Sequence, residues 1–298
     1  TSGNYNTFLG SGAGGAITTG GQNTFVGRNV GTGADDASFC VAIGDTVLNA
    51  HFGNSNYGFG YNVLTSITGT GNIGIGNNVN TASNSRNYTI GIGVNALRHN
   101  NMHYIVAIGF QAGEENTSGD KNTYLGYSAG WKNQTGNKVT AVGYEAGAYA
   151  TASGNTLVGT EAGRGSNSAP YTSGDKNTAL GYRALYSFTT AGNNTALGWN
   201  ALLNVTTGGS NTAIGHQAGN NLTTGDQNVF VGTNAGYNAT GSQENGVAIG
   251  YNAGYQNFNS ATVYVGRYAG YSGTGHIGTG NIGIGYHALF TNSSTDVE

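Results

Sequence analysis

The chain has 298 residues, of which 55 are glycine and only one, Pro170, is proline; charged residues make up 8% of it and the formal net charge is −3. This balance leaves no basic stripe that could neutralise a run of phosphates, so we expect no nucleic-acid partner. The longest apolar runs, such as Tyr104 to Ile108, are far shorter than the roughly 20 residues of a membrane-spanning helix, so we expect no membrane insertion.

One phrase, close to Asn-Thr-Ala-Leu-Gly, recurs from end to end. In chain order its glycine is residue 10, 27, 44, 60, 76, 93, 109, 126, 143, 159, 181, 198, 215, 232, 250, 266 and 285. A fixed period near 17 residues is typical of a stacked repeat architecture. We therefore predict one repeat domain over residues 1–290, with loop insertions near 164–174 and 271–280, where the spacing is longer, and a tail over 291–298.

Numbering each copy from its glycine as position 0 exposes a strand pattern. Position −1 is aliphatic or aromatic in all seventeen copies, and position −3 is β-branched in all but one, where it is Tyr57. Two such positions separated by one residue predict a short strand. Position +3 is always Ala or Val, a second inward site, and the glycine between them allows a sharp bend. The sequence thus predicts an all-β fold, a parallel β-solenoid of about 17 coils.

The two faces of the predicted strand are both apolar. We expect positions −1 and −3 to face the core, and position −2, which is Ala or Gly in eleven copies, to face outward. An outer face with nothing suited to water predicts that a second copy covers it, and a thin core favours a homotrimer. The candidate trimer contacts are the position −2 residues Ala196, Ala213, Ala248, Phe230 and Tyr264.

Two further columns are defined by the repeat. Asn occupies position −4 in eleven copies, where it either forms a hydrogen-bonded ladder or only favours a turn. Position +1 is often aromatic. Exposed, such rings form a ridge that can bind sugars; buried, they pack one coil on the next. The candidate glycan or receptor contacts are Tyr127, Tyr144, Tyr182, Trp199, Tyr251 and Tyr286.

No catalytic or metal-binding constellation is visible, so we expect no enzyme activity, no metal and no cofactor. His99 and His103 are four residues apart without the flanking carboxylate of a helical metal motif. The adjacent Glu114 and Glu115 point to opposite faces of a strand and cannot form an acid/base pair. The single cysteine, Cys40, is expected to be a passive packing residue.

Two phrases resemble known repeat families. Val-Ala-Ile-Gly, at Val41–Gly44, Val106–Gly109 and Val247–Gly250, resembles the head repeats of trimeric autotransporter adhesins; the longer phrase at Thr206–Ala218 and Asn177–Leu185 is similar to the shaft repeats of bacteriophage tail fibres. The resemblance implies left-handed coils and three chains side by side. It also implies an extracellular location, on a virion tail or a cell surface.

The expected function is therefore that of a structural and adhesive fibre, most simply a trimeric phage tail-fibre shaft with a host glycan or protein receptor. The alternatives are a bacterial adhesin head, a polysaccharide-degrading tailspike, and an ice-binding surface built on the Thr residues of position −3. Because the chain begins at Thr1 without Met, we expect a fragment or a processed product.

Overall fold

A computed structural model describes residues 3–34, 36–82, 87–168, 170–256, 258–271 and 278–290. In these ranges the chain is a parallel β-solenoid without helices, with one strand in each coil of about 17 residues, which confirms the predicted fold class. The contacts divide it into two units, residues 1–142 and 143–298, which are described separately. The predicted tail over 291–298 and most of the predicted insertion near 271–280 lie outside the described ranges, and the single domain over 1–290 stays a prediction.

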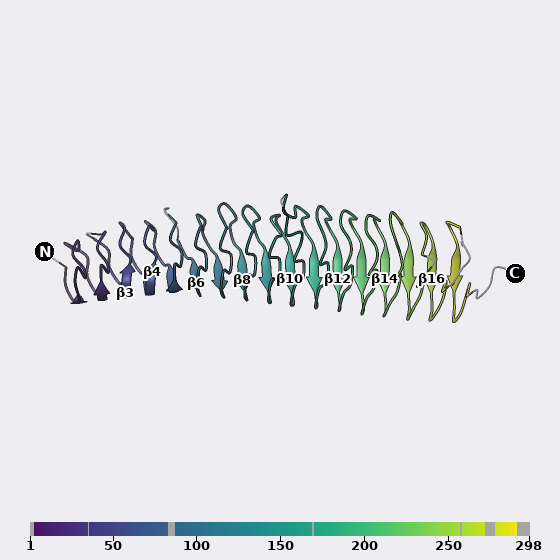
Figure 1. The fold of residues 1–298 in the computed structure, drawn as a ribbon, viewed down its shortest axis with the longest axis horizontal. Coiled ribbons are helices and arrows are strands. Elements are labelled where there is room, and N and C mark those ends of the chain that lie inside the picture. The colour runs from purple at the N-terminus through teal and green to yellow at the C-terminus, as the bar shows by residue number, and fades with distance from the viewer. Residues whose placement is uncertain are drawn as a thin grey trace. The chain divides into compact units, whose positions relative to one another are not determined.

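The first unit contributes nine strands that pair in parallel with their sequence neighbours (Figure 1). They are β1 (Thr7–Leu9), β2 (Thr24–Arg28), β3 (Val41–Val47), β4 (Tyr57–Val63), β5 (Ile73–Asn77), β6 (Ile90–Ile92), β7 (Val106–Ile108), β8 (Thr123–Leu125) and β9 (Thr140–Val142). The strands β3 and β4 are longer than the rest, since their ladders continue past the glycine to position +3.

The second unit contributes eight strands of three residues each. They are β10 (Thr156–Val158), β11 (Thr178–Leu180), β12 (Thr195–Leu197), β13 (Thr212–Ile214), β14 (Val229–Val231), β15 (Val247–Ile249), β16 (Val263–Val265) and β17 (Ile282–Ile284). The register places equal positions of the repeat side by side, as in Ala196 beside Ala213. Each position of the repeat therefore forms a column that runs along the stack.

Every coil turns at the repeat glycine, whose φ lies between 125° and 139° in all seventeen copies. Residues with a side chain rarely adopt this backbone conformation. A Cβ atom added to Gly198 would also lie 2.5 Å from the carbonyl oxygen of Gly215 in the next coil. The missing side chain is thus required twice, by the bend and by the close approach of successive coils.

Replacing Gly198 with alanine is expected to destabilise the second unit by at least about 1–3 kcal/mol, the usual cost of a non-glycine residue in such a conformation. Thermal unfolding followed by circular dichroism measures the change. Gly278→Ala is the matched control, because a Cβ there meets no atom within 4 Å. Equal melting temperatures for the two variants would contradict this account of the turn.

The core is lined by positions −2 and +3, and this corrects the predicted orientation of the strand. Each strand of the second unit has a buried middle residue between two partly or fully exposed ones. The residues expected to contact other chains are fully buried within their own chain, namely Ala196, Ala213, Ala248, Phe230 and Tyr264. They are not available to a neighbouring copy. Positions −1 and −3, expected inside, lie outside.

The core keeps its volume by an exchange between positions −2 and +4. Where position −2 is bulky, position +4 is glycine, as in Phe230 with Gly236; where position +4 is leucine, position −2 is small, as in Ala196 with Leu202. The ring of Phe230 leaves no room for more, since a Cβ on Gly236 would lie 2.1 Å from it. Where both positions are small, as in Ala213 with Gly219, a large residue of a neighbouring coil takes the space: a Cβ on Gly219 would lie 2.6 Å from the ring of Phe230.

This relation between positions −2 and +4 predicts that a larger residue at one position compensates for a smaller residue at the other. Phe230→Ala alone should cost about 3–5 kcal/mol of folding free energy, and Gly236→Leu alone about 1–3 kcal/mol, through a cavity and through overpacking respectively. Leucine is tolerated at position +4, where Leu202 has a φ of 50°. The double variant should therefore be more stable than the sum of the two losses implies, by an amount that urea unfolding of all four proteins measures. Simple additivity would show that the two positions do not share one space.

The asparagines of position −4 form a hydrogen-bonded ladder, one of the two alternatives that the sequence left open. In the second unit the side-chain oxygen of Asn194 accepts a hydrogen bond from the backbone N–H of Asn211 at 2.9 Å, and the side-chain amide of Asn194 donates to the carbonyl of Gly208 at 2.9 Å. The same pattern repeats through Asn155, Asn177, Asn211 and Asn228. These fully or nearly buried side chains thus satisfy backbone groups at a corner that no strand pairing reaches.

Candidate functional site

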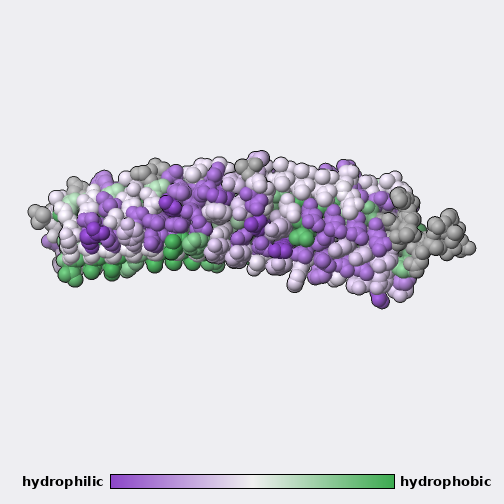
Figure 2. Space-filling view, in the orientation of Figure 1, coloured by the Kyte–Doolittle hydropathy of each residue, from purple (hydrophilic) through white to green (hydrophobic). Residues whose placement is uncertain are grey.

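The outer face of the sheet in each unit is made of positions −1 and −3, where position −1 is apolar in every coil and position −3 is threonine in eight coils and apolar in most others. In both units none of these residues is buried, and several are well exposed, among them Ile43, Leu125, Leu180 and Ile214. Figure 2 shows a row of hydrophobic residues along the edge of the first unit that carries the strands. No residue at either position is charged. We call these two columns the apolar face.

The aromatic residues of position +1 lie beside the apolar face, just past the glycine turn, and they are exposed on the single chain. Trp199 is 54% exposed and Tyr286 is 66% exposed; the other predicted receptor contacts Tyr127, Tyr144, Tyr182 and Tyr251 lie between 38% and 48%. The column is therefore a surface ridge of the chain. Whether it binds a glycan stays a prediction.

Stacking between neighbouring rings limits the ring surface that the ridge exposes to a sugar. The rings of Phe110 and Tyr127 lie 5.1 Å apart and nearly parallel, so each covers a face of the other. Tyr182 and Trp199 are equally close, but their planes are tilted by 56°. A sugar packs on a free ring face. Both rings of the tilted pair also have a further neighbour: the guanidinium of Arg183 lies 5.1 Å from the ring centre of Tyr182, and the ring of His216 lies 5.9 Å from that of Trp199.

The carboxylates and histidines singled out in the sequence have separate structural partners. Glu114 accepts a hydrogen bond from the indole N–H of Trp131 at 2.9 Å, while Glu115 forms an ion pair with Lys132. The Nδ1 atom of His103 accepts a hydrogen bond from a backbone N–H at 3.1 Å. Within the described ranges no three His, Cys, Asp or Glu side chains lie together as metal ligands.

A cluster that the sequence did not indicate lies in the second unit, where Arg164 and Arg183 meet two glutamates. The Nε atom of Arg164 is 2.5 Å from Glu145, and that of Arg183 is 2.5 Å from Glu161. Burial disfavours the charge of Arg164, but the hydrogen bond to Glu145 and the electrostatic interactions with Tyr186, Glu145 and Tyr149 together outweigh it, so the pKa of Arg164 is raised. Glu145, Glu161 and Arg183 all occupy position +2 of consecutive coils. This shared position was the sequence feature from which their proximity could have been predicted.

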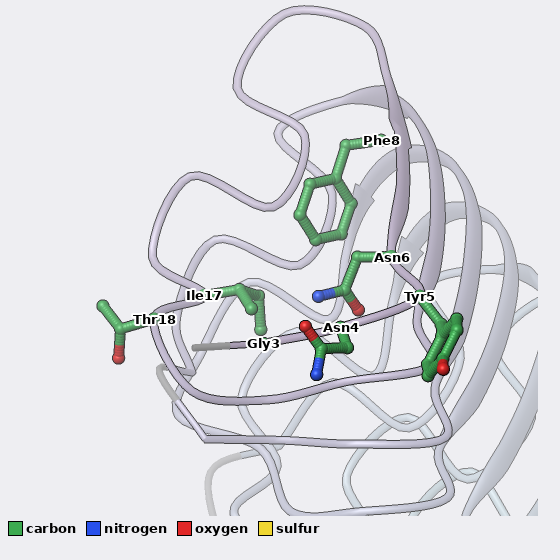
Figure 3. A pocket seen from close by; sticks show the side chains of 7 residues that line it. All are labelled: Gly3, Asn4, Tyr5, Asn6, Phe8, Ile17 and Thr18. Carbon is green, nitrogen blue, oxygen red and sulfur yellow. The ribbon is translucent and has the colours of Figure 1, made fainter. Parts of the chain in front are cut away.

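The first coil contains a hollow of about 390 Å³ lined by Gly3, Asn4, Tyr5, Asn6, Phe8, Ile17 and Thr18. Figure 3 shows the ring of Phe8 and the side chain of Ile17 at this hollow, with Tyr5 and Thr18 to its sides. Phe8 occupies position −2 and stacks on Phe25 at 5.3 Å, yet it is 39% exposed. The hollow is therefore the uncovered end of the core, and its lining shows no set of converging polar groups typical of a binding site.

Cys40 lies in the core of the first unit, fully buried, and burial raises the pKa of its thiol. A raised pKa lowers the fraction of reactive thiolate at any given pH.

No helix in the described part of the chain is long and apolar enough to cross a membrane.

The folded protein is accordingly expected not to react with a thiol reagent such as dithionitrobenzoate at pH 8 within the time that a free cysteine reacts completely. Denaturation in guanidinium chloride should release one equivalent of thiol. Absorbance of the released thionitrobenzoate measures both states. Rapid reaction of the folded protein would show that this part of the core opens readily.

Comparison with known proteins adds no relative: no family model matches the chain, and neither a curated protein nor a solved structure matches it.

Proposed function

We propose that the chain is the shaft of an extracellular fibre, in which three copies associate through their apolar faces. The observation that carries the proposal is the apolar face itself, an uncharged surface present in every coil of both units. Large exposed apolar surfaces mark interaction sites in soluble proteins. The proposed partner copy therefore contacts positions −1 and −3, which the sequence was expected to bury. The residues of position −2, which were expected to contact it, lie in the core.

The periodicity of the face favours a second copy as its occupant. Side chains recur along each column at the strand spacing of about 4.8 Å. A partner that fills such a surface needs the same period, and a second copy of this chain has it. The absence of charge at positions −1 and −3 also means that identical faces do not repel each other.

Three copies are proposed because the repeats resemble those of trimeric fibres and adhesins, and from the same resemblance we propose left-handed coils. A phage tail fibre is the first candidate and a bacterial adhesin head is the alternative. The exposed ridge of position +1 flanks the apolar face, so a trimer built on that face would leave the ridge near its outer edge for a receptor. The carboxylates of Glu145, Glu161 and Glu114 are held in ion pairs or hydrogen bonds, and we propose no polysaccharide-cleaving activity.

Ile214→Arg tests the proposed seam, because Ile214 is 38% exposed at position −1 in the single chain. The parent is expected to sediment as a trimer and the variant as a monomer, since burying unpaired charges at a shared interface costs several kcal/mol each. On a free surface the same change alters stability by no more than about 0.5 kcal/mol.

Analytical ultracentrifugation gives the mass, and circular dichroism shows whether the variant keeps its β-structure. Asn238→Arg, at a partly buried position +6 away from the strands, is the control and should leave the mass unchanged. A monomeric parent would end the proposal. A trimeric Ile214→Arg variant would show that the copies contact each other through a surface other than the apolar face.

A further inference from the structure

The second unit departs from its regular stack at one described place. The spacing between repeat glycines is 22 residues from Gly159 to Gly181, and Gly165 still donates a backbone hydrogen bond to the next coil, to the carbonyl of Tyr186 at 3.0 Å. The chain rejoins the ladder at Thr172, which pairs with Ala150. Figure 1 shows this loop, after β10, projecting on the side of the coils away from the strands. Insertions in repeat proteins commonly carry binding functions.

A pocket of about 290 Å³ lies at the base of this loop. It is lined by Arg164, Gly165, Ser166, Asn167, Tyr186, Ser187 and Thr189, and we call it the Arg164 pocket. Its volume is at the lower end of the range for ligand sites, about 300–1,000 Å³, so it suits a ligand the size of one sugar ring. No acidic residue lines it.

The guanidinium group of Arg164 is held in place before any ligand arrives. Its Nε atom is bound to Glu145, its carbon Cζ lies 4.9 Å from the ring centre of Tyr149, and its Nη1 atom donates to the hydroxyl of Tyr186 at 3.4 Å. The side chain is only 17% exposed. Holding a donor rigidly reduces the entropy lost on binding.

Some N–H groups of the Arg164 guanidinium have no hydrogen-bond acceptor among the residues that the structure describes. A guanidinium carries five N–H groups, and within the described ranges only one on Nε and one on Nη1 have a hydrogen-bond acceptor. The hydroxyl hydrogen of Tyr186 and the hydroxyl of Ser187 likewise have no acceptor there. Around the cation the pocket therefore presents the free N–H groups of Arg164 together with the hydroxyls of Tyr186 and Ser187. A guanidinium with free N–H groups matches a carboxylate, which binds two N–H groups of an arginine at once.

We propose that the Arg164 pocket binds an acidic sugar, with the carboxylate against the free end of the Arg164 guanidinium and the ring hydroxyls against Tyr186, Ser187 and Asn167. This inference goes beyond the proposed shaft. The pocket belongs to the side of the coils away from the apolar face, and binding does not depend on the number of copies.

The test compares D-glucuronate with D-glucose, which differ in the carboxylate, by isothermal titration calorimetry on the full chain. Glucuronate is expected to bind at least about tenfold more tightly, since charge-assisted hydrogen bonds are about twice as strong as neutral ones. Equal affinity for the two sugars, or no binding of glucuronate, would overturn the proposal. Neither outcome bears on the oligomeric mass, which tests the shaft separately.

Two variants locate the site. Arg164→Lys keeps the charge but loses the planar fork, so glucuronate binding should weaken about tenfold. Arg98→Lys is the control: Arg98 also forms an ion pair, with Glu114 in the first unit, and does not line the pocket, so its variant should bind as the parent does.

Tyr186→Phe removes one hydroxyl and leaves the ion pairs in place, so it should weaken glucuronate binding several-fold even if Arg164→Lys disturbs the fold. Circular dichroism melts of all variants identify any such disturbance. Equal losses in Arg164→Lys and Arg98→Lys, or full binding by Tyr186→Phe, would place the sugar outside this pocket.

Discussion

The approach of one coil to the next at the repeat glycine is the constraint on which the rest of the structure depends. There the backbone turns with a φ near 130°, and the space that a Cβ would fill is occupied by the carbonyl oxygen of the following glycine. Coils can stack at the distance of a parallel strand ladder only because nothing protrudes at this point. Both the strand before the turn and the inward residue after it take their positions from this bend.

The bend leads to a strained but repetitive backbone. Residues at positions −5 and +2 have φ values near +50° to +60° in coil after coil, for example Lys176 and Arg183. Glycine or asparagine adopts this conformation most easily, yet glutamate, arginine and lysine also occupy it here. The ladder of buried asparagines offsets part of this cost by satisfying the backbone at a corner.

The sequence predicts the period, the strands and the glycine turn because each of these repeats in every copy. It does not predict which face of the strand is inside, because both faces are apolar and alternation alone separates two faces without ranking them. The exchange between positions −2 and +4, as in Phe230 with Gly236, was the signal that could have decided it. The Arg164 cluster was harder to foresee: its partners Glu145 and Tyr186 are 19 and 22 residues away, and the inserted loop lengthens the second of these spacings.

The exchange of core volume also dictates the order of the coils. The strand and asparagine ladders are alike in the coils around Phe230, which have Asn194, Asn211 and Asn228 at position −4, so they would form equally well if one coil were skipped and two more distant coils paired. The ring of Phe230, however, lies against both Gly219 of the coil before and Gly236 of its own. Skipping a coil would bring Leu202 to the place of Gly219 and force a leucine into the space of the ring. Large core residues thus act as alignment marks, and they direct a chain of near-identical repeats to a single pairing.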